Sequence, residues 1–369
     1  MSTPQGPVAN DTGWYPEVTT DRLRLRRFDH GDAADVLAIH SRLDVVKWLD
    51  NPPFHLMADE DEARERIDGY LAAEAEDPLV ARRAIEEIAS GRVVGSVLLA
   101  RCARLDGGFV GEYELGWHLH PDAAGRGYAT QAARLLAAQA FVAGHDELVI
   151  GMYSDNDASA AVAHRLGAED LGIGPDPWYG GDGHNFRLRP EHLARVETER
   201  LVLRAFTRHD LDFLADLFSI PEVARWSGAG RPRTRTEVQA QLAGQPGRAG
   251  PHPSTGVFAI CPRTSTGAVG GPVGVAMLVP LPASAGSERR DVEIGWHLHP
   301  SAQGRGFATE AARALVERAR DGGISEVHAV THPDNAASQA VCRRLGMTDL
   351  GLRDDWYDQT LRAFRLPTA

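Results

Sequence analysis

One eight-residue pattern, Glu-Leu/Ile-Gly-Trp-His-Leu-His-Pro, occurs twice in this chain of 369 residues. It begins at Glu114 and again at Glu293, 179 residues later. Trp48 and Trp226 repeat at almost the same distance, 178 residues. Solenoid repeats are roughly 20–50 residues long, so a period of this length indicates a duplicated domain. The chain is therefore predicted to contain two copies of one fold.

The repeat also predicts where the domains begin and end. Residues 1–19 are polar, contain Pro and Gly and lack an apolar run, so we expect a flexible tail without a signal peptide. The first copy is expected at 20–189, a linker at 190–197 and the second copy at 198–369. Each copy is long enough to bury a hydrophobic core of its own.

Composition excludes several classes of function. A net charge of −12 argues against a nucleic-acid partner, which requires a basic face, and is compatible with a cationic substrate. No apolar stretch is long enough to span a membrane. Cys102, Cys261 and Cys342 form no Cys-x-x-Cys pair and are odd in number. They fit reduced, buried thiols of a cytoplasmic protein better than a disulfide framework or a zinc site.

The repeated pattern reads as a strand, a glycine-rich turn and a helix. Apolar and polar residues alternate over 292–298, as in a half-buried strand, and Pro300 ends it. Gly304 and Gly306 precede a helix whose alanines recur at helical spacing. Free N–H groups and the helix dipole at such a start favour a phosphate group, and Arg305 adds positive charge.

The remaining segments predict an α+β (α/β) fold. A charged amphipathic helix is expected over 59–75, a long helix over 128–143 and a short apolar strand over 148–153. In the second copy, residues 244–256 and 282–290 are rich in Gly, Pro or Ser and are expected to be mobile loops.

Each half resembles the GNAT N-acetyltransferases, most closely those of the RimJ/RimL type that modify ribosomal proteins. The acetyl-CoA motif of that family is Gln/Arg-x-x-Gly-x-Gly/Ala. The second copy matches it fully from Gln303 to Ala308, whereas the first copy has Ala124 at the first position. The resemblance implies two tandem acyl-CoA N-acyltransferase domains. Each would have a mixed, mostly antiparallel sheet flanked by helices.

The resemblance further implies that acetyl-CoA binds along the end of the strand, the glycine turn and the cap of a later helix. In the second copy these residues are His297, Leu298, His299, Gln303, Gly304, Arg305, Gly306, Phe307, Ala308, Thr309 and Asn335. In the first copy they are His118, Leu119, His120, Gly125, Arg126, Gly127, Tyr128, Ala129, Thr130 and Asn156.

In this family an amine attacks the thioester directly, and CoA leaves as a thiol. We assign the general base to Glu293, and to Glu114 in the first copy, acting through water. Ser338 and Ser159 are assigned to protonate the departing thiolate. His297 shares the polar face of the strand with Glu293 and could line the entrance for the amine.

Other readings of these residues stay open. The two glutamates could form structural ion pairs, and the two serines could be ordinary first-turn helix residues. A Walker loop is disfavoured because no Lys-Ser/Thr follows the glycines, and a dinucleotide fold because Gly-x-Gly-x-x-Gly is incomplete. The His-x-His pairs lack an evident third ligand, so no metal is expected.

The sequence predicts an acetyl-CoA-dependent N-acetyltransferase acting on a primary amine, either a protein N-terminus or a small molecule. One copy, the first rather than the second because of Ala124, could instead be an inactive structural or regulatory domain. A CoA-sensing module without turnover is a third reading. The acceptor and the length of the acyl group stay undetermined. Both a monomeric pseudo-dimer and a homodimer are compatible with the tandem copies.

Overall fold

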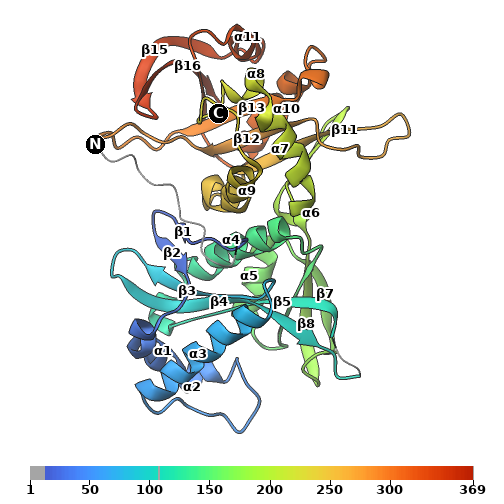
Figure 1. Cartoon of the computed structure of the whole chain (residues 1–369). Helices are drawn as coiled ribbons and strands as arrows, with labels where there is room; N and C mark the ends of the chain where they lie inside the picture. Colours follow the sequence, from blue (N-terminus) through green and yellow to red (C-terminus); the bar gives the residue numbers. More distant parts are fainter. Residues whose placement is uncertain (1–12, 107–108, 369) are drawn as a thin grey trace. The chain divides into compact units, whose positions relative to one another are not determined.

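The computed structural model describes residues 13–106 and 109–368. They form two compact units, and the division falls between Leu193 and Ala194. Unit 1 holds the first copy and unit 2 the second. Each unit builds one eight-stranded sheet flanked by helices (Figure 1).

Unit 1 places a helical segment between its second and third strands and another helix after its fifth strand. Its elements are β1 (Val18–Thr19), β2 (Leu23–Arg26), η1 (His30–Asp32), α1 (Ala33–His40), α2 (Leu43–Val46), α3 (Glu60–Glu76), β3 (Ala81–Glu87), β4 (Arg92–Ala103), β5 (Phe109–Leu119), η2 (Pro121–Ala123), α4 (Tyr128–Ala143), β6 (Leu148–Tyr153), α5 (Asp157–Leu166), β7 (Glu169–Pro175), β8 (Asp182–Leu188) and α6 (Pro190–Leu193).

Unit 2 repeats this order. Its elements are β9 (Arg195–Glu197), β10 (Leu201–Ala205), η3 (Arg208–Asp210), α7 (Leu211–Ser219), α8 (Pro221–Ala224), α9 (Arg235–Ala249), β11 (Gly256–Pro262), β12 (Gly274–Pro280), β13 (Val292–Leu298), η4 (Pro300–Ala302), α10 (Phe307–Asp321), β14 (Glu326–Thr331), α11 (Ala336–Arg344), β15 (Thr348–Trp356) and β16 (Gln359–Pro367).

Both sheets are mixed and mostly antiparallel, as predicted. The strand order is β1-β2-β3-β4-β5-β6-β8-β7 in unit 1 and β15-β16-β14-β13-β12-β11-β10-β9 in unit 2. In the described part of the chain, β5 and β6 are the parallel neighbours of the first sheet and β13 and β14 those of the second. The repeated sequence pattern therefore lies on the strand at which each sheet changes direction.

The strand β5 carries different chemistry on its two faces, because successive side chains point to opposite sides of a sheet. Leu115 belongs to the apolar core beneath α4, together with Leu136 and Ile150. Glu114 and His118 point to the other face, where α1 and α3 pack (Figure 1). The polar face predicted from the alternation is thus turned toward the helices inserted between β2 and β3.

Unit 2 has the same two layers. Ile294 packs with Leu315 of α10 in one core. The opposite face of β13 carries Glu293 and His297, and the ring of Phe218 from α7 lies 5.7 Å from the His297 ring.

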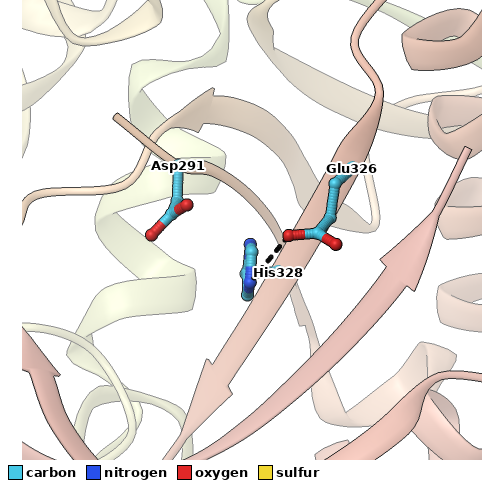
Figure 2. A group of neighbouring side chains, drawn as sticks. All are labelled: Asp291, Glu326 and His328. Atoms are coloured by element: carbon cyan, nitrogen blue, oxygen red, sulfur yellow. Dashed lines mark ion pairs between the residues drawn. The ribbon is translucent and has the colours of Figure 1, made fainter. Parts of the chain in front are cut away.

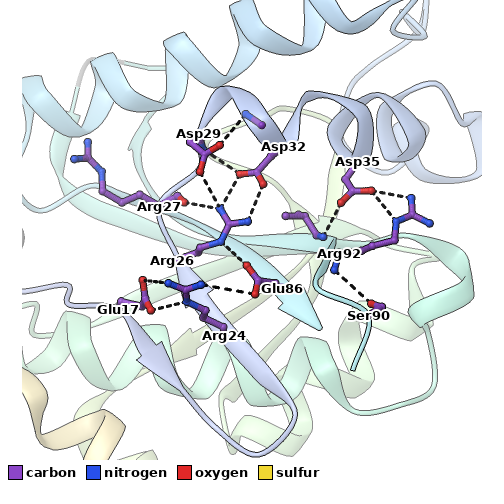
Figure 3. A network of polar contacts seen from close by, with 12 residues as sticks. Glu17, Arg24, Arg26, Arg27, Asp29, Asp32, Asp35, Glu86, Ser90 and Arg92 are labelled. Atoms are coloured by element: carbon purple, nitrogen blue, oxygen red, sulfur yellow. Dashed lines mark hydrogen bonds and ion pairs between the residues drawn. The ribbon is translucent and has the colours of Figure 1, made fainter. Parts of the chain in front are cut away.

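An ion-pair network fixes the start of α1 against the sheet of unit 1 (Figure 3). Arg26 of β2 donates to both carboxylate oxygens of Asp32, at 2.8 and 2.7 Å, and the side chain of Asp29 caps η1. Burial alone would disfavour the Arg26 charge, but the hydrogen bond to Asp32 outweighs it and raises its pKa. Arg204 and Asp210 repeat the bidentate pair in unit 2.

Part of the segment assigned to a flexible tail instead packs on unit 1. Tyr15 is 1% exposed, and its hydroxyl donates to the backbone oxygen of Leu79 at 3.1 Å. Val18 and Thr19 form β1, which pairs with β2. The tail was predicted from the mean polarity of residues 1–19, and a single buried aromatic ring and a short strand do not change that mean enough to be recognised. Residues 1–12 lie outside the described residues.

The expected mobile loop at 244–256 is also partly wrong, because α9 continues to Ala249. A capping box of Thr234 and Glu237 starts this helix, and Val238 and Leu242 bury its apolar face. Pro246 lies inside α9, three residues before its end, and its missing N–H removes one i→i−4 hydrogen bond there.

The expected linker at 190–197 contains α6 and β9, and β9 pairs with β10 of the second sheet. All three cysteines are free and buried, as the sequence predicted. Among the described residues, no helix combines the length and apolarity that crossing a bilayer would require.

Candidate active site

The parallel strands of each sheet separate directly after one residue pair. In unit 1 that pair is Glu114 opposite Val149, and in unit 2 it is Glu293 opposite His328. Beyond this point β13 continues to Leu298, where no described strand pairs with it on the β14 side. The backbone groups on that side are therefore available to an extended ligand, which could pair with β13 as another strand would.

The strand leads into the predicted glycine cradle. Gly125 and Gly127 have φ of 75° and 77°, and Gly304 and Gly306 have φ of 73° and 82°, values that favour glycine. No side chain caps the first turn of α4 or α10. A Cβ at Gly304 would meet nothing within 4 Å, so the space above the turn is open. Uncapped N–H groups beside open space fit a phosphate group.

In unit 1 a carboxylate stands beside the cradle. Glu87 of β3 accepts hydrogen bonds from Arg126 Nη1 at 2.9 Å and from the Tyr128 hydroxyl at 2.7 Å. The bond from Tyr128 is the main reason that the pKa of Glu87 is lowered, so this group is ionised at neutral pH. The charge of Arg126 is therefore already balanced.

Unit 2 lacks this carboxylate. Its cradle has Pro262 where Glu87 stands, since Pro262 pairs with Leu201 as Glu87 pairs with Leu23. Arg305 is exposed, and its guanidinium lies 4.6 Å from the centroid of the Phe307 ring. It forms no ion pair within the described ranges. The arginine of the glycine turn is thus free of ion pairs in the second cradle and engaged in the first, although the second cradle also has a carboxylate, Glu310 in the first turn of α10, which pairs with Arg200.

The turn of unit 2 is also tethered more firmly. Gln303 Nε2 donates to the backbone oxygen of Leu298 at 3.2 Å and so joins the turn to the end of β13. Ala124, the counterpart in unit 1, has no group that could make this bond.

Both predicted bases are bound by a tyrosine. The Tyr357 hydroxyl donates to Glu293 Oε2 at 2.6 Å, and the Tyr179 hydroxyl donates to Glu114 Oε2 at 2.5 Å. Burial raises the pKa of Glu293, and the bond from Tyr357 partly opposes that rise. Burial and the nearby carboxylate raise the pKa of Tyr357, so its hydroxyl stays protonated and acts as a donor.

These two tyrosines were not predicted as site residues from the sequence. A sequence feature that could have identified them is the Trp-Tyr pair, which recurs at the repeat distance. The tryptophans hold the hairpins that carry the tyrosines, because Trp356 Nε1 donates to Asp291 at 2.9 Å and Trp178 Nε1 to Glu112 at 2.8 Å. Tyr357 also has φ of 60°, a conformation that costs a non-glycine residue about 1–3 kcal/mol.

The histidines of the polar face are half-buried and lie beside other rings. His118 lies 4.9 Å from His40, the last residue of α1. Burial, followed by the charges of Arg248 and Arg233, lowers the pKa of His297 to about 4. His297 is therefore neutral at pH 7 and cannot offer a positive charge there.

The predicted caps of the later helices are present. Asn156 Oδ1 accepts from Ser159 N at 3.2 Å at the start of α5, and Asn335 Oδ1 accepts from Ser338 N at 3.1 Å at the start of α11. The side-chain oxygens of the two asparagines thus cap the helix N-termini, and their side-chain NH₂ groups remain available to a ligand. Each serine occupies the third position of its helix, so its role in proton transfer stays a prediction.

Three other residues that were predicted to bind acetyl-CoA form hydrogen bonds within the protein itself. His120 Nδ1 accepts from Asp122 N at 3.2 Å, and His299 Nδ1 accepts from Ser301 N at 3.3 Å, which caps η2 and η4. The Thr130 hydroxyl accepts from Arg165 at 3.1 Å.

Within residues 13–106 and 109–368, one set of side chains meets the spacing of a metal site. Ligand atoms of Asp291, Glu326 and His328 lie within 4.8 Å of one another (Figure 2). However, Arg289 donates to Asp291 at 3.2 Å, and Arg365 lies 3.4 Å from Glu326. The carboxylates are thus already balanced, and a cation would compete with two guanidinium groups. We interpret the set as an ion-pair cluster around His328, the residue of β14 that lies opposite Glu293.

Each unit thus combines a mixed sheet that opens at one parallel pair, a carboxylate at the opening and an uncapped glycine turn beyond it. The chain matches the sequence profile of the acetyltransferase (GNAT) domain at residues 22–169 and again at 200–348. It therefore belongs to the GNAT acetyltransferase family, and the predicted family and fold class are confirmed.

Individual relatives cover only parts of the chain. The uncharacterized N-acetyltransferase YnaD of Bacillus subtilis is 31% identical over 75 residues, which are 18% of this chain and 44% of YnaD. The chain thus covers less than half of that relative. An acetyltransferase from Agrobacterium tumefaciens is 25% identical (TM-score 0.38, covering 47% of this chain and 93% of its own). Mycobacterium smegmatis RimJ in complex with CoA-disulfide is 19% identical (TM-score 0.41, 49% and 90%).

The first prediction concerns His328, which is 3% exposed. Its Nε2 lies 3.4 Å from Glu326, but its Nδ1 has no hydrogen-bond partner among the residues that the structure describes. Val149 occupies the equivalent place in unit 1. An unsatisfied buried polar atom costs about 1–3 kcal/mol, so His328→Val should raise the Tm of the full chain and Val149→His should lower it. Calorimetry with and without EDTA checks both. A large loss of Tm in His328→Val, or a loss on EDTA addition to the wild type alone, would contradict the ion-pair interpretation.

The second prediction concerns pH. The pKa of His297 falls from 6.5 to about 4 on folding. The unfolded chain therefore binds this proton first as pH falls, and stability should be lost between about pH 6.5 and 4. The His297 ring resonance should not titrate above pH 5 in NMR spectra, and His297→Gln should reduce the loss of Tm over that range. A ring that titrates near 6.5 would show that His297 is not desolvated.

Proposed function

We propose that the protein is an acetyl-CoA-dependent N-acetyltransferase whose second copy holds the stronger active site. The observation that carries this proposal is the position of Glu293. Glu293 is the β13 residue at which β13 and β14 separate. Its carboxylate lies on the face away from α10, and β13 leads from it into the glycine cradle.

The residues present fit the donor. The uncapped first turn of α10 and the side chain of Arg305 would hold the diphosphate, and the open side of β13 would pair with the pantetheine arm. The side-chain NH₂ of Asn335 would bind the arm from α11. When bound, acetyl-CoA supplies the acyl group as a thioester.

The chain itself supplies the proton transfers. Glu293, whose pKa is raised by burial, accepts a proton from the acceptor ammonium through a water molecule. Tyr357 fixes the orientation of that carboxylate by its 2.6 Å hydrogen bond. Ser338, in the first turn of α11, is our candidate for protonating the CoA thiolate that leaves, which gives the free thiol. Glu114, Tyr179 and Ser159 would take the same roles in unit 1.

The two copies should bind CoA unequally. Each cradle has one paired carboxylate, Glu87 in unit 1 and Glu310 in unit 2. The arginine of the glycine turn is engaged by that carboxylate in unit 1, whereas Arg305 is free to bind a diphosphate in unit 2. This supports a second candidate role for the first copy, that of a weak or regulatory CoA site. A charge-assisted hydrogen bond contributes about 1.5 kcal/mol, so we expect roughly a tenfold difference in Kd.

The third prediction tests the cradles by isothermal titration of the full chain with CoA. Gly304→Asp should abolish the tighter site and Gly125→Asp the weaker one, because each puts a negative charge where a diphosphate binds. Asp tolerates the left-handed backbone of these positions, and the isosteric Gly304→Asn controls for the added side chain. In the Gly304→Asp background, Glu87→Gln should strengthen the remaining site about tenfold. Binding that survives both Asp substitutions would refute the proposed donor site.

The fourth prediction tests the base. The double substitution Glu114→Gln and Glu293→Gln should lower kcat for thiol release by roughly 10²–10⁴, with CoA affinity retained. Tyr357→Phe, in the Gly125→Asp background, removes a bond that lowers the pKa of Glu293. The acid limb of the kcat/KM profile should therefore move to higher pH. An unmoved limb would place the titrating base elsewhere.

A further inference from the structure

The face of the sheet that carries the base also carries unpaired arginines in both units. In unit 1, Arg82 of β3 lies opposite Leu98, which in turn lies opposite Gly116. Directly opposed residues share a face, so Arg82 stands in the same row as Gly116, the residue between Glu114 and His118. Its guanidinium rests on the ring of Tyr70 in α3, 4.6 Å from the centroid.

Unit 2 brings a guanidinium to the same row from a different element. Arg248 of α9 has its Nη2 3.4 Å from the sulfur of Met277. Met277 lies opposite Gly295, and its terminal carbon would come within 2.5 Å of a Cβ added there. The charge of Arg248 therefore lies over the glycine between Glu293 and His297. Val257, which pairs with Met277, takes the strand position that Arg82 has in unit 1.

A second arginine accompanies each of these. Arg233 lies 4.9 Å from the centroid of the Phe218 ring, and that ring packs on His297. In unit 1, desolvation above all, and then the charges of His40, Arg82 and Arg66 of α3, lower the pKa of the half-buried His118. Throughout the described residues, none of these four arginines forms an ion pair with a carboxylate. The nearby histidines are neutral and do not add to the positive charge.

In each unit two arginines without a carboxylate ion pair among the described residues lie near the base, and the charge of one of them, Arg82 or Arg248, also acts on Glu114 or Glu293. Both arginines restrict the acceptor. They would repel a polyamine or an amine with a second positive charge. A carboxylate of the acceptor would find the bidentate partner that the guanidinium fork prefers. The two units reach this pattern with different residues, so the shared property is the charge itself rather than one inherited side chain.

We infer that the acceptor is a primary amine that carries a carboxylate close to the amino group. The carboxylate would bind Arg82 in unit 1 and Arg248 in unit 2, while the amine faces Glu114 or Glu293. This inference rests on the proposed N-acetyltransferase function. It narrows the acceptor to amino-acid-like molecules or to peptide N-termini whose first residue is acidic. The cationic acceptor suggested by the net charge of −12 is thereby replaced, because the local charge of the site has the opposite sign.

The test measures thiol release from acetyl-CoA by the full chain with matched acceptors. The peptide arm compares Glu-Ala-amide with Gln-Ala-amide, and the small-molecule arm compares alanine with alaninamide. In at least one arm kcat/KM should favour the carboxylate by about tenfold, the factor that one charge-assisted hydrogen bond supplies. The arm that shows the preference identifies the source of the acceptor.

Arginine variants then decide whether the preference comes from these residues. In the double substitution Arg82→Met and Arg248→Met the ratio of the two kcat/KM values should fall toward one. Lys at both positions should restore part of it, because lysine keeps the charge but not the fork. Arg353→Met, on the exposed part of β15, is the matched control and should keep the full ratio.

Three outcomes are separable. Acetylation of neutral or dicationic amines as efficiently as of carboxylated ones, or a preference that the double Met variant retains, overturns this inference and leaves the proposed function standing. A preference lost with Met and partly restored with Lys supports it. Absence of thiol release with every amine overturns the proposed function, and this inference with it.

Discussion

Each unit depends on the separation of two parallel strands after a single residue pair. Glu114 with Val149, and Glu293 with His328, are the last points at which the sheet is closed. Backbone groups beyond them would be unsatisfied in a buried sheet, so the opening persists only where water or a ligand can reach it. The glutamate that we propose as the base lies where the strands part, and the glycine turn lies where the open strand ends. One backbone feature thus sets the distance between this carboxylate and the proposed donor site.

The two faces of the central strand, β5 in unit 1 and β13 in unit 2, have different roles. Apolar residues such as Ile294 fix the strand against α10 and so hold the cradle in place. Polar residues such as Glu293 project toward α7 and α9, where burial changes their chemistry. The same burial makes a carboxylate more basic and a histidine less so, because both changes reduce charge in a poorly solvated place. Tyr357, held in a left-handed conformation, offsets part of that cost with its hydrogen bond to the carboxylate.

Sequence reasoning reached the features that depend on local pattern. Alternation placed Glu114 and His118 on one face, and the glycines of the cradle require the left-handed backbone that they adopt. It missed features formed between distant segments. The bond from Tyr179 to Glu114 spans 65 residues, and the burial of Tyr15 depends on Leu79. Neither contact leaves a periodic trace. The repeat offered the one indirect signal, since the Trp-Tyr pairs keep its spacing.

The duplication makes each unit a comparison for the other. Shared features, namely the split strands, the Glu–Tyr bond and the asparagine caps, are those on which the proposed acyl transfer rests. The charged groups beside the glycine turn differ, since Glu87 pairs with Arg126 in unit 1 and Glu310 pairs with Arg200 in unit 2. Positive charge around the acceptor is present in both, although Arg82 and Arg248 come from different elements. The charged residues thus differ between the units at the proposed donor site, whereas positive charge is shared at the proposed acceptor site. This pattern is expected if both copies recognise one kind of amine but bind the cofactor with different affinities.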